Sequence, residues 1–111
     1  MQGEFGIAGV TFNGRQELLE KLWLEAYESG DRRMVELVPE PENKYDANAV
    51  RIDVNMNGIK KDIGYVPKDI NQNVLALLKD DRIKYARLIK VGKVPDKNIF
   101  GGTISYEISE K

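Results

Sequence analysis

Residues 50–68 read VRIDVNMNGIKKDIGYVPK, and this stretch decides the fold. Val50, Ile52 and Val54 alternate with charged residues, which is the pattern of a strand that buries one face. The pair Asn57 and Gly58 is strongly preferred in tight hairpin turns. A second strand, over residues 61–66, then returns alongside the first. The stretch therefore predicts an antiparallel hairpin around which a sheet is built.

Short strand patterns recur on both sides of this hairpin, interrupted by two helical patterns. The helix candidates are residues 16–29 and 69–79. About six short strands with two helices indicate an α+β, mainly β, domain, which we expect to form a small OB-like β-barrel with two flanking helices. An α+β sandwich is the alternative. The further strand candidates are residues 5–12, 33–38, 83–91 and 103–108.

One face of the first helix candidate is apolar. Its residues recur at the spacing of a single stripe on a helix with 3.6 residues per turn. Charged residues, mostly glutamates, take the opposite face. The pattern predicts that the whole stripe belongs to the core, its tryptophan included. The stripe consists of Leu18, Leu19, Leu22, Trp23 and Ala26.

The chain length of 111 residues fits one domain, expected over residues 1–111. There is no Cys and no His, which excludes disulfides, thiol nucleophiles, imidazole bases and zinc sites built from these ligands. The three serines have no histidine to activate them, so we expect no enzymatic activity and no cofactor. A hydrolase that uses carboxylates alone is a minor alternative.

Targeting signals are missing from the sequence. No apolar run approaches the ~20 residues that a membrane helix needs. The N-terminal MQGEFGIAGV has no basic segment followed by a long apolar one. We therefore expect a soluble, cytoplasmic protein with no membrane partner.

Charge is unevenly placed although its sum is only −1. Residues 1–59 carry 6 Lys or Arg against 11 Asp or Glu, whereas residues 60–97 carry 10 against 5. The two segments therefore have net charges of −5 and +5. This asymmetry could turn the second segment toward a polyanion, although ordinary solvated surfaces produce similar counts.

The segment before the strand of Val50 reads EPENKYDANA, residues 40–49, and its prolines and Asx residues favour an irregular loop. In a structural interpretation, Asp46 and Asn48 accept backbone hydrogen bonds while Tyr45 packs at the base of the loop. In a functional one, the tyrosine ring is a stacking surface beside acceptors for a flat ligand with hydroxyl groups. A calcium site at Glu40, Glu42 and Asp46 is a weaker alternative, because the regular oxygen spacing of calcium loops is missing.

The junction between the second hairpin strand and the second helix candidate reads IGYVPK, residues 63–68. A helix N-terminus carries free N–H groups and a partial positive charge, and Lys68 adds a full charge beside it. This corner is suited to a phosphate group. The alternative is that Tyr65 is a core residue and Lys68 is merely solvated.

Three segments together resemble the HIRAN domain, a family of stand-alone bacterial and phage proteins and of modules in helicase-like DNA-repair remodellers. The resemblance covers most of the chain, and the middle segment is the most specific. It implies a modified OB-like β-barrel that binds DNA, notably free 3′ ends of single strands. The segments are AGVTF followed by GRQ (residues 8–12 and 14–16), PEPENKYDANAV (residues 39–50) and IGYVPK (residues 63–68).

The resemblance also implies roles for single residues. Tyr45 is similar to the aromatic residue that lies against the terminal nucleotide, and Asp46 to the acceptor of the free 3′-hydroxyl. Asn48 shapes their loop. Lys68 is similar to the family's phosphate-contacting lysine, with Tyr65 at a neighbouring position of the pocket.

The first strand and the loop depart from the family pattern. The remodellers carry an Arg-Tyr pair on the first strand, where this chain has Val10 and Thr11, with Phe12 as the nearest aromatic residue. This lowers the affinity expected for DNA. Lys44 stands where the family often has proline before Tyr-Asp, which makes the loop less rigid or lets Lys44 itself recruit a phosphate.

We therefore expect a single HIRAN-like domain that binds single-stranded DNA at its free 3′-hydroxyl end, in DNA repair or processing, with any helicase or nuclease supplied as a separate chain. The alternative is a non-catalytic protein–protein interaction module that presents the acidic Trp23 helix or the Tyr45 loop to a partner. A nucleic-acid binder should gather cations around the Tyr45 loop. The candidates are Lys68 with Lys60, Lys61, Arg82, Lys84 and Arg87.

Overall fold

The computed structural model describes residues 1–29 and 33–110, without the side chains of residues 26–29. Six strands and two helices occur in this part of the chain, as predicted. The predicted core position of Ala26 lies outside the described side chains. The elements are β1 (Gln2–Gly6), α1 (Arg15–Ser29), β2 (Arg33–Pro39), β3 (Val50–Met56), β4 (Ile59–Tyr65), α2 (Asn71–Lys79), β5 (Ile83–Val94) and β6 (Ile99–Ile108).

The hairpin predicted from residues 50–66 is confirmed. β3 and β4 pair antiparallel, with Met56 opposite Ile59 and Arg51 opposite Tyr65. The two residues between them both have positive φ, 55° for Asn57 and 84° for Gly58, as the tightest type of hairpin turn requires. The local sequence therefore determines this part of the sheet.

All six strands form one antiparallel sheet in the order β1-β6-β5-β2-β3-β4. The α+β class is thus confirmed. The closed barrel is not, because the sheet remains open between its edge strands β1 and β4. One isolated bridge spans this opening: the Ala8 N–H donates to the Tyr65 carbonyl at 2.8 Å, and the Tyr65 N–H donates to the Ala8 carbonyl at 2.9 Å.

Gly64 makes this bridge possible. Its φ is 143°, and a Cβ atom there would lie 2.4 Å from the Ile7 side chain and 2.5 Å from the Ala8 carbonyl oxygen. A side chain at this position would therefore push the first loop away from β4. The bridge holds that loop against the end of β4, where the candidate site begins.

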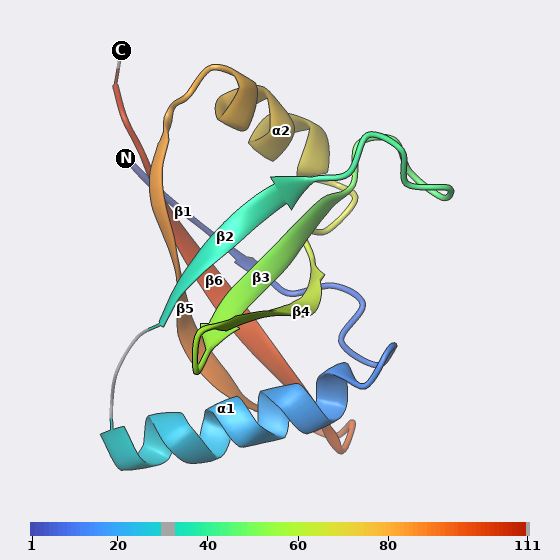
Figure 1. Ribbon diagram of the computed structural model, residues 1–111, viewed down its shortest axis with the longest axis vertical. Coiled ribbons are helices and arrows are strands. Elements are labelled where there is room, and N and C mark those ends of the chain that lie inside the picture. The colour runs from blue at the N-terminus through green and yellow to red at the C-terminus, as the bar shows by residue number, and fades with distance from the viewer. Residues whose placement is uncertain (30–32, 111) are drawn as a thin grey trace.

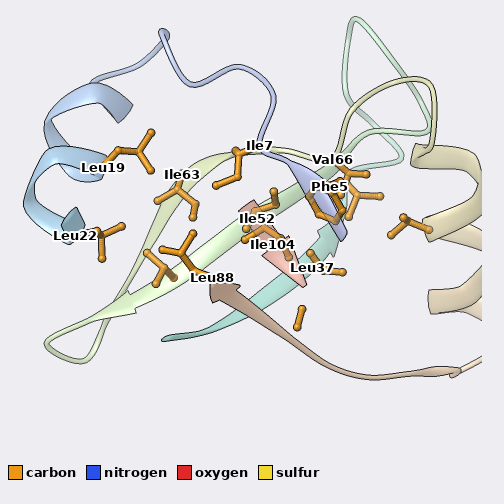
Figure 2. Close-up of a cluster of buried hydrophobic side chains, with 14 of the residues drawn as sticks. Phe5, Ile7, Leu19, Leu22, Leu37, Ile52, Ile63, Val66, Leu88 and Ile104 are labelled. Atoms are coloured by element: carbon orange, nitrogen blue, oxygen red, sulfur yellow. The ribbon is translucent and has the colours of Figure 1, made fainter. Parts of the chain in front are cut away.

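The helices cover opposite ends of the curled sheet, α1 at one end and α2 at the other (Figure 1). Neither described helix is long and apolar enough to cross a membrane. Leu19 and Leu22 of α1 point toward apolar side chains of the sheet (Figure 2), and both are essentially fully buried. Burial of these apolar side chains is the main favourable term in folding. The most buried core side chains of the sheet and α2 are Val50, Ile52, Val54, Ile63, Val74 and Ile104.

The core position predicted for Trp23 is wrong. Its side chain is 37% exposed, and its ring lies at the edge of the core with its centroid 5.7 Å from that of Phe100. Leu19 and Leu22 face the sheet directly, so Trp23 is rotated away from the centre of the buried stripe. The sequence pattern marked a stripe wider than the one the sheet covers.

The first strand and the second helix are shorter than predicted. β1 ends at Gly6 rather than at residue 12, because Ala8 turns to pair with Tyr65 and Gly9 adopts a φ of 72°. The predicted helix over residues 69–79 begins at Asn71, because a turn precedes it in which the Ile70 N–H donates to the Pro67 carbonyl. The first loop, residues 7–14, and the turn before α2 both contribute to the site described next.

Candidate functional site

A hollow of about 640 Å³ opens where three segments meet. Its wall is formed by the first loop with the start of α1, by the loop between β2 and β3, and by the junction between β4 and α2. These segments lie on the same side of the molecule in Figure 1. Five of the seven predicted site residues line this hollow: Phe12, Tyr45, Asp46, Tyr65 and Lys68.

The loop between β2 and β3, residues 40–49, is held by its own side chains. The Asn43 Oδ1 atom accepts the backbone N–H groups of Tyr45 at 2.9 Å and of Asp46 at 3.1 Å. One Asp46 oxygen accepts the backbone N–H of Asn48 at 2.9 Å. These Asx turns confirm the structural interpretation for Asp46, whereas Asn48 contributes through its backbone N–H.

Tyr45 does not pack at the base of this loop. Its side chain is 90% exposed and stands at the rim of the hollow. Phe12, which is 65% exposed, stands at the rim on the first loop. The hollow therefore has two rim aromatics that are free to stack against a ligand.

Asp46 lies in the wall with both carboxylate oxygens bonded. Its second oxygen accepts a hydrogen bond of 2.8 Å from the side-chain amide of Asn71, the first residue of α2. The Asn48 N–H, the Asn71 amide and the charge of Lys68 lower the pKa of Asp46 below its ordinary value of 3.8, against a smaller opposing effect of burial. The carboxylate is therefore ionised at neutral pH and acts only as an acceptor.

The Tyr65 ring lines the hollow while its hydroxyl is used elsewhere. The hydroxyl donates to Glu40 Oε1 at 2.7 Å, and the same carboxylate accepts from Asn43 and Arg51. Burial alone would raise the pKa of Glu40, but these three hydrogen bonds lower it below its ordinary value of 4.5. Burial, together with the bond to Glu40, raises the pKa of Tyr65. The phenol is thus neutral and fixed.

Arg15 lies against the Tyr65 ring and also lines the hollow. Its guanidinium donates to the Gly9 carbonyl at 2.8 Å and to Asp62 at 2.7 Å, and its central carbon lies 5.2 Å from the ring centroid. The side chain is 3% exposed. Arg15 Nε is the one buried side-chain polar atom without a hydrogen-bond partner among the described residues. Arg15 therefore joins the first loop, α1 and β4 at the wall of the hollow.

Lys68 follows Pro67 at the junction and is exposed beside Asp46. Lys44 and Asn48 do not line the hollow. Lys44 lies next to it, on a neighbouring depression formed by residues 39–44. Lys68 is thus the exposed cation of the wall.

The expected gathering of further cations around the Tyr45 loop is not observed. Lys60 forms an ion pair with Glu36 at 2.6 Å. Lys61 lies four residues from Tyr65 along β4, or about 13 Å at the usual rise of a strand. None of the five further candidates, Lys60, Lys61, Arg82, Lys84 and Arg87, is among the lining residues of the hollow in the described part of the chain.

Two of the three acidic residues of the loop, Glu40 and Asp46, accept hydrogen bonds from donors of the chain itself. Glu40 accepts from Tyr65, Asn43 and Arg51, and Asp46 from Asn48 and Asn71. Within residues 1–29 and 33–110, no group of three or more acidic side chains is placed to hold a metal ion.

Sequence reasoning missed Asn71, the pairing of Glu40 with Tyr65, and the site role of Arg15, a residue that it quoted only as part of the GRQ segment. The contacts of Arg15 with Asp62, Glu40 with Tyr65, and Asn71 with Asp46 join residues 47, 25 and 25 positions apart. No local pattern marks such pairs. The turn made by Asn43, by contrast, is local, because an Asn side chain in a loop commonly accepts the backbone N–H two residues further on.

Comparisons with known proteins identify the family of the chain and agree with its fold. The HIRAN domain model matches residues 5–99. The fold is similar to the crystal structure of the HIRAN domain of human HLTF, with a TM-score of 0.56 and 15% sequence identity over 98% of this chain and 77% of that one. The chain has no significant match among curated proteins. Since the family model spans most of the sequence, the chain belongs to the HIRAN domain family.

Proposed function

We propose that this domain binds single-stranded DNA at its free 3′-hydroxyl end and has no catalytic activity of its own. The observation that carries the proposal is the position of Asp46, an ionised carboxylate in the wall of a hollow whose rim holds the exposed ring of Tyr45. Membership of the HIRAN family supports this assignment. A role in DNA repair or processing, beside a helicase or nuclease on another chain, is part of the proposal.

The rim aromatics supply sequence-independent affinity. Every base has a flat face, and stacking on an aromatic side chain contributes about 1–3 kcal/mol per base. Tyr45 is the better placed of the two rings, because it neighbours Asp46 and is the more exposed. A terminal base stacked on Tyr45 would bring its sugar close to the Asp46 carboxylate.

Asp46 gives the preference for the end of a strand. Each carboxylate oxygen has two acceptor positions, and the intramolecular bonds to Asn48 and Asn71 use one on each. A terminal 3′-hydroxyl can donate to a remaining position. A 3′-phosphate offers negative charge and acceptors, which the carboxylate repels. Lys68 then binds an internal phosphate without reading the sequence.

The test is a titration of the domain with a short oligonucleotide labelled at its 5′ end, carrying either a 3′-hydroxyl or a 3′-phosphate. We expect tighter binding of the hydroxyl end by about tenfold or more, as for a hydrogen bond to a charged group. Asp46→Asn should remove this preference. Asp69→Asn is the matched control, because Asp69 is exposed in the same turn as Lys68 and does not line the hollow. Equal affinity of the unmodified domain for both ends would contradict the proposal.

A protein–protein interaction module remains the second candidate. The observation that favours it is the exposed apolar surface of α1, where Leu24 is 53% and Trp23 37% exposed beside acidic residues. A module of this kind would lose its partner when Leu24 is replaced by a charged residue. The oligonucleotide titration separates the two, because Leu24 is outside the hollow and the same variant should bind DNA normally.

A further inference from the structure

Asn71 is a buried amide that the sequence motifs of the site do not include. It is the first residue of α2, its side chain is 3% exposed, and it lines the hollow. Burying an amide costs free energy unless its donors and acceptors are bonded. Val74, one turn further along the same helix, is fully buried and apolar. An apolar residue would therefore suit position 71 if packing were the only requirement.

The amide does not cap its own helix. The residue before it, Ile70, makes no side-chain capping hydrogen bond, and the amide of Asn71 is directed across the chain to Asp46, with 2.8 Å between Nδ2 and Oδ2. The partner lies 25 residues earlier, on the loop that carries Tyr45. Asn71 thus connects α2 to the carboxylate that the proposed function uses.

The second hydrogen bond fixes the plane of the Asp46 carboxylate. The torsion that turns a carboxylate about its last bond is broad, so one bond leaves the group free to rotate. The Asn48 N–H holds Oδ1 from within the loop, and Asn71 holds Oδ2 from α2. Held from two elements, the group presents its remaining acceptor positions in fixed directions.

We infer that Asn71 is a positioning residue that sets the preference of the pocket for a terminal hydroxyl by holding the Asp46 carboxylate in one orientation. The inference rests on the proposed function. Asn71 itself need not touch the nucleotide, because it acts through Asp46. The ligand that the pocket prefers is therefore a strand that ends in a free sugar hydroxyl rather than one that ends in a phosphate.

A purely structural role would have a different signature. If Asn71 only tied the loop to α2, its removal would loosen the position of Tyr45 as well, and affinity for both kinds of end would fall in parallel. If it orients the carboxylate, the affinity for the phosphate end should change little. The ratio of the two affinities is therefore the informative quantity.

The experiment measures this ratio for the unmodified domain, Asn71→Ala and the control Asn73→Ala, with the same 5′-labelled oligonucleotides. Asn73 is exposed on the same helix and does not line the hollow. We expect Asn71→Ala to lower the ratio by about fivefold, the usual effect of losing one hydrogen bond, and Asn73→Ala to leave it unchanged. If Asn71→Ala does not fold, Asn71→Ser, whose shorter side chain does not reach Asp46 Oδ2, replaces it with the same expected loss.

A second measurement needs no DNA. Carbon NMR of the Asp46 carboxyl should show its pKa rising toward the ordinary value of 3.8 in Asn71→Ala, with Lys68 and the Asn48 N–H unchanged beside it. A preserved ratio, or a parallel loss of affinity for both ends, would overturn the inference. If the unmodified domain shows no preference for the hydroxyl end, the proposed function itself fails, so the two failures are distinguishable.

Discussion

The Tyr65 hydroxyl donates a hydrogen bond of 2.7 Å to Glu40, which joins the end of β4 to the start of the loop that carries Tyr45 and Asp46. Glu40 also accepts a hydrogen bond from the side-chain amide of Asn43. The Asn43 side-chain oxygen in turn accepts hydrogen bonds from the backbone N–H groups of Tyr45 and Asp46. The ring of Tyr65 thus lines the hollow, while its hydroxyl helps to hold the loop that carries Tyr45 and Asp46.

We expect Tyr65→Phe to destabilise the domain by about 1 kcal/mol, the typical net value of one hydrogen bond. The ring over Arg15 is retained, so the core should remain intact. Hydrogen exchange at the N–H groups of Tyr45 and Asp46 should accelerate, because the loop loses an anchor. Tyr85→Phe is the control, since the Tyr85 ring contacts the guanidinium of Arg87 rather than a carboxylate. Unchanged exchange in the loop would show that the hydroxyl does not shape it.

Glu40 should contribute stability that depends on pH. Its pKa is lower in the folded protein than its ordinary value of 4.5. A carboxyl of this kind stabilises the fold fully above its unfolded pKa and loses that contribution as the pH falls through the folded pKa. Glu40→Gln should therefore cost about 1 kcal/mol at neutral pH, a value reduced for partial exposure, and progressively less below about pH 4.5.

Urea unfolding of Glu40→Gln at several pH values measures this difference. Glu42→Gln is the matched control, because Glu42 is an exposed carboxylate on the same loop. A difference between Glu40→Gln and the unmodified domain that stays constant down to low pH would mean that the charge of Glu40 is not what stabilises the fold.

Lys68→Ala should weaken binding of all DNA sequences alike, because an ammonium group binds phosphate without reading bases. For single strands, each phosphate contact contributes about −0.7 to the slope of log K against log salt concentration. With Lys68 in the wall and Lys44 beside it, we expect a slope of about −1.4, reduced by about 0.7 in Lys68→Ala. Lys61→Ala should leave the slope unchanged. A change in base preference would assign Lys68 a different role.

The hairpin was predictable because its signals are local. Alternating apolar residues from Val50 to Val54 and the pair Asn57 and Gly58 need no information from the rest of the chain. The end of the first strand was harder to predict. The alternation that begins at Phe5 gives no sign that Ala8 leaves β6 to pair with Tyr65, a residue 57 positions away.

The residues of the candidate site likewise fall into those that the local sequence marks and those that only the fold brings to the site. Motif residues such as Tyr45 and Asp46 were recognisable because a family resemblance and Asx spacing both mark them. Asn71 carried no such mark, and Arg15 was quoted in the GRQ segment without a role, because each becomes part of the site only when α2 or α1 packs beside a distant segment. A polar residue at the start of a helix is common, and only its burial in the fold distinguishes Asn71.

Trp23→Ala should cost about 1–2 kcal/mol, less than the ~3–5 kcal/mol of a fully buried aromatic residue. The ring is partly exposed and packs mainly on Phe100. Leu22→Ala, at a position that is 1% exposed one residue earlier, should cost more, about 2–5 kcal/mol. Urea unfolding of both variants gives the comparison. A larger loss for Trp23 than for Leu22 would place the tryptophan in the core after all.

Tyr45→Ala separates binding from folding more cleanly than any other change. The ring is 90% exposed, so its removal should alter the free energy of unfolding by no more than about 0.5 kcal/mol. Binding should weaken by about 1–3 kcal/mol for every sequence, because stacking is lost whatever the base. The preference for a 3′-hydroxyl should survive, since Asp46 keeps its bonds to Asn48 and Asn71.

Fluorescence anisotropy with both kinds of end measures affinity and preference together, and circular dichroism confirms folding. Ala47→Ser, at an exposed position of the same loop that does not line the hollow, controls for general disturbance of the loop. If Tyr45→Ala bound single strands as tightly as the unmodified domain, the exposed ring would serve something other than DNA, and the interaction module would become the better explanation of this surface.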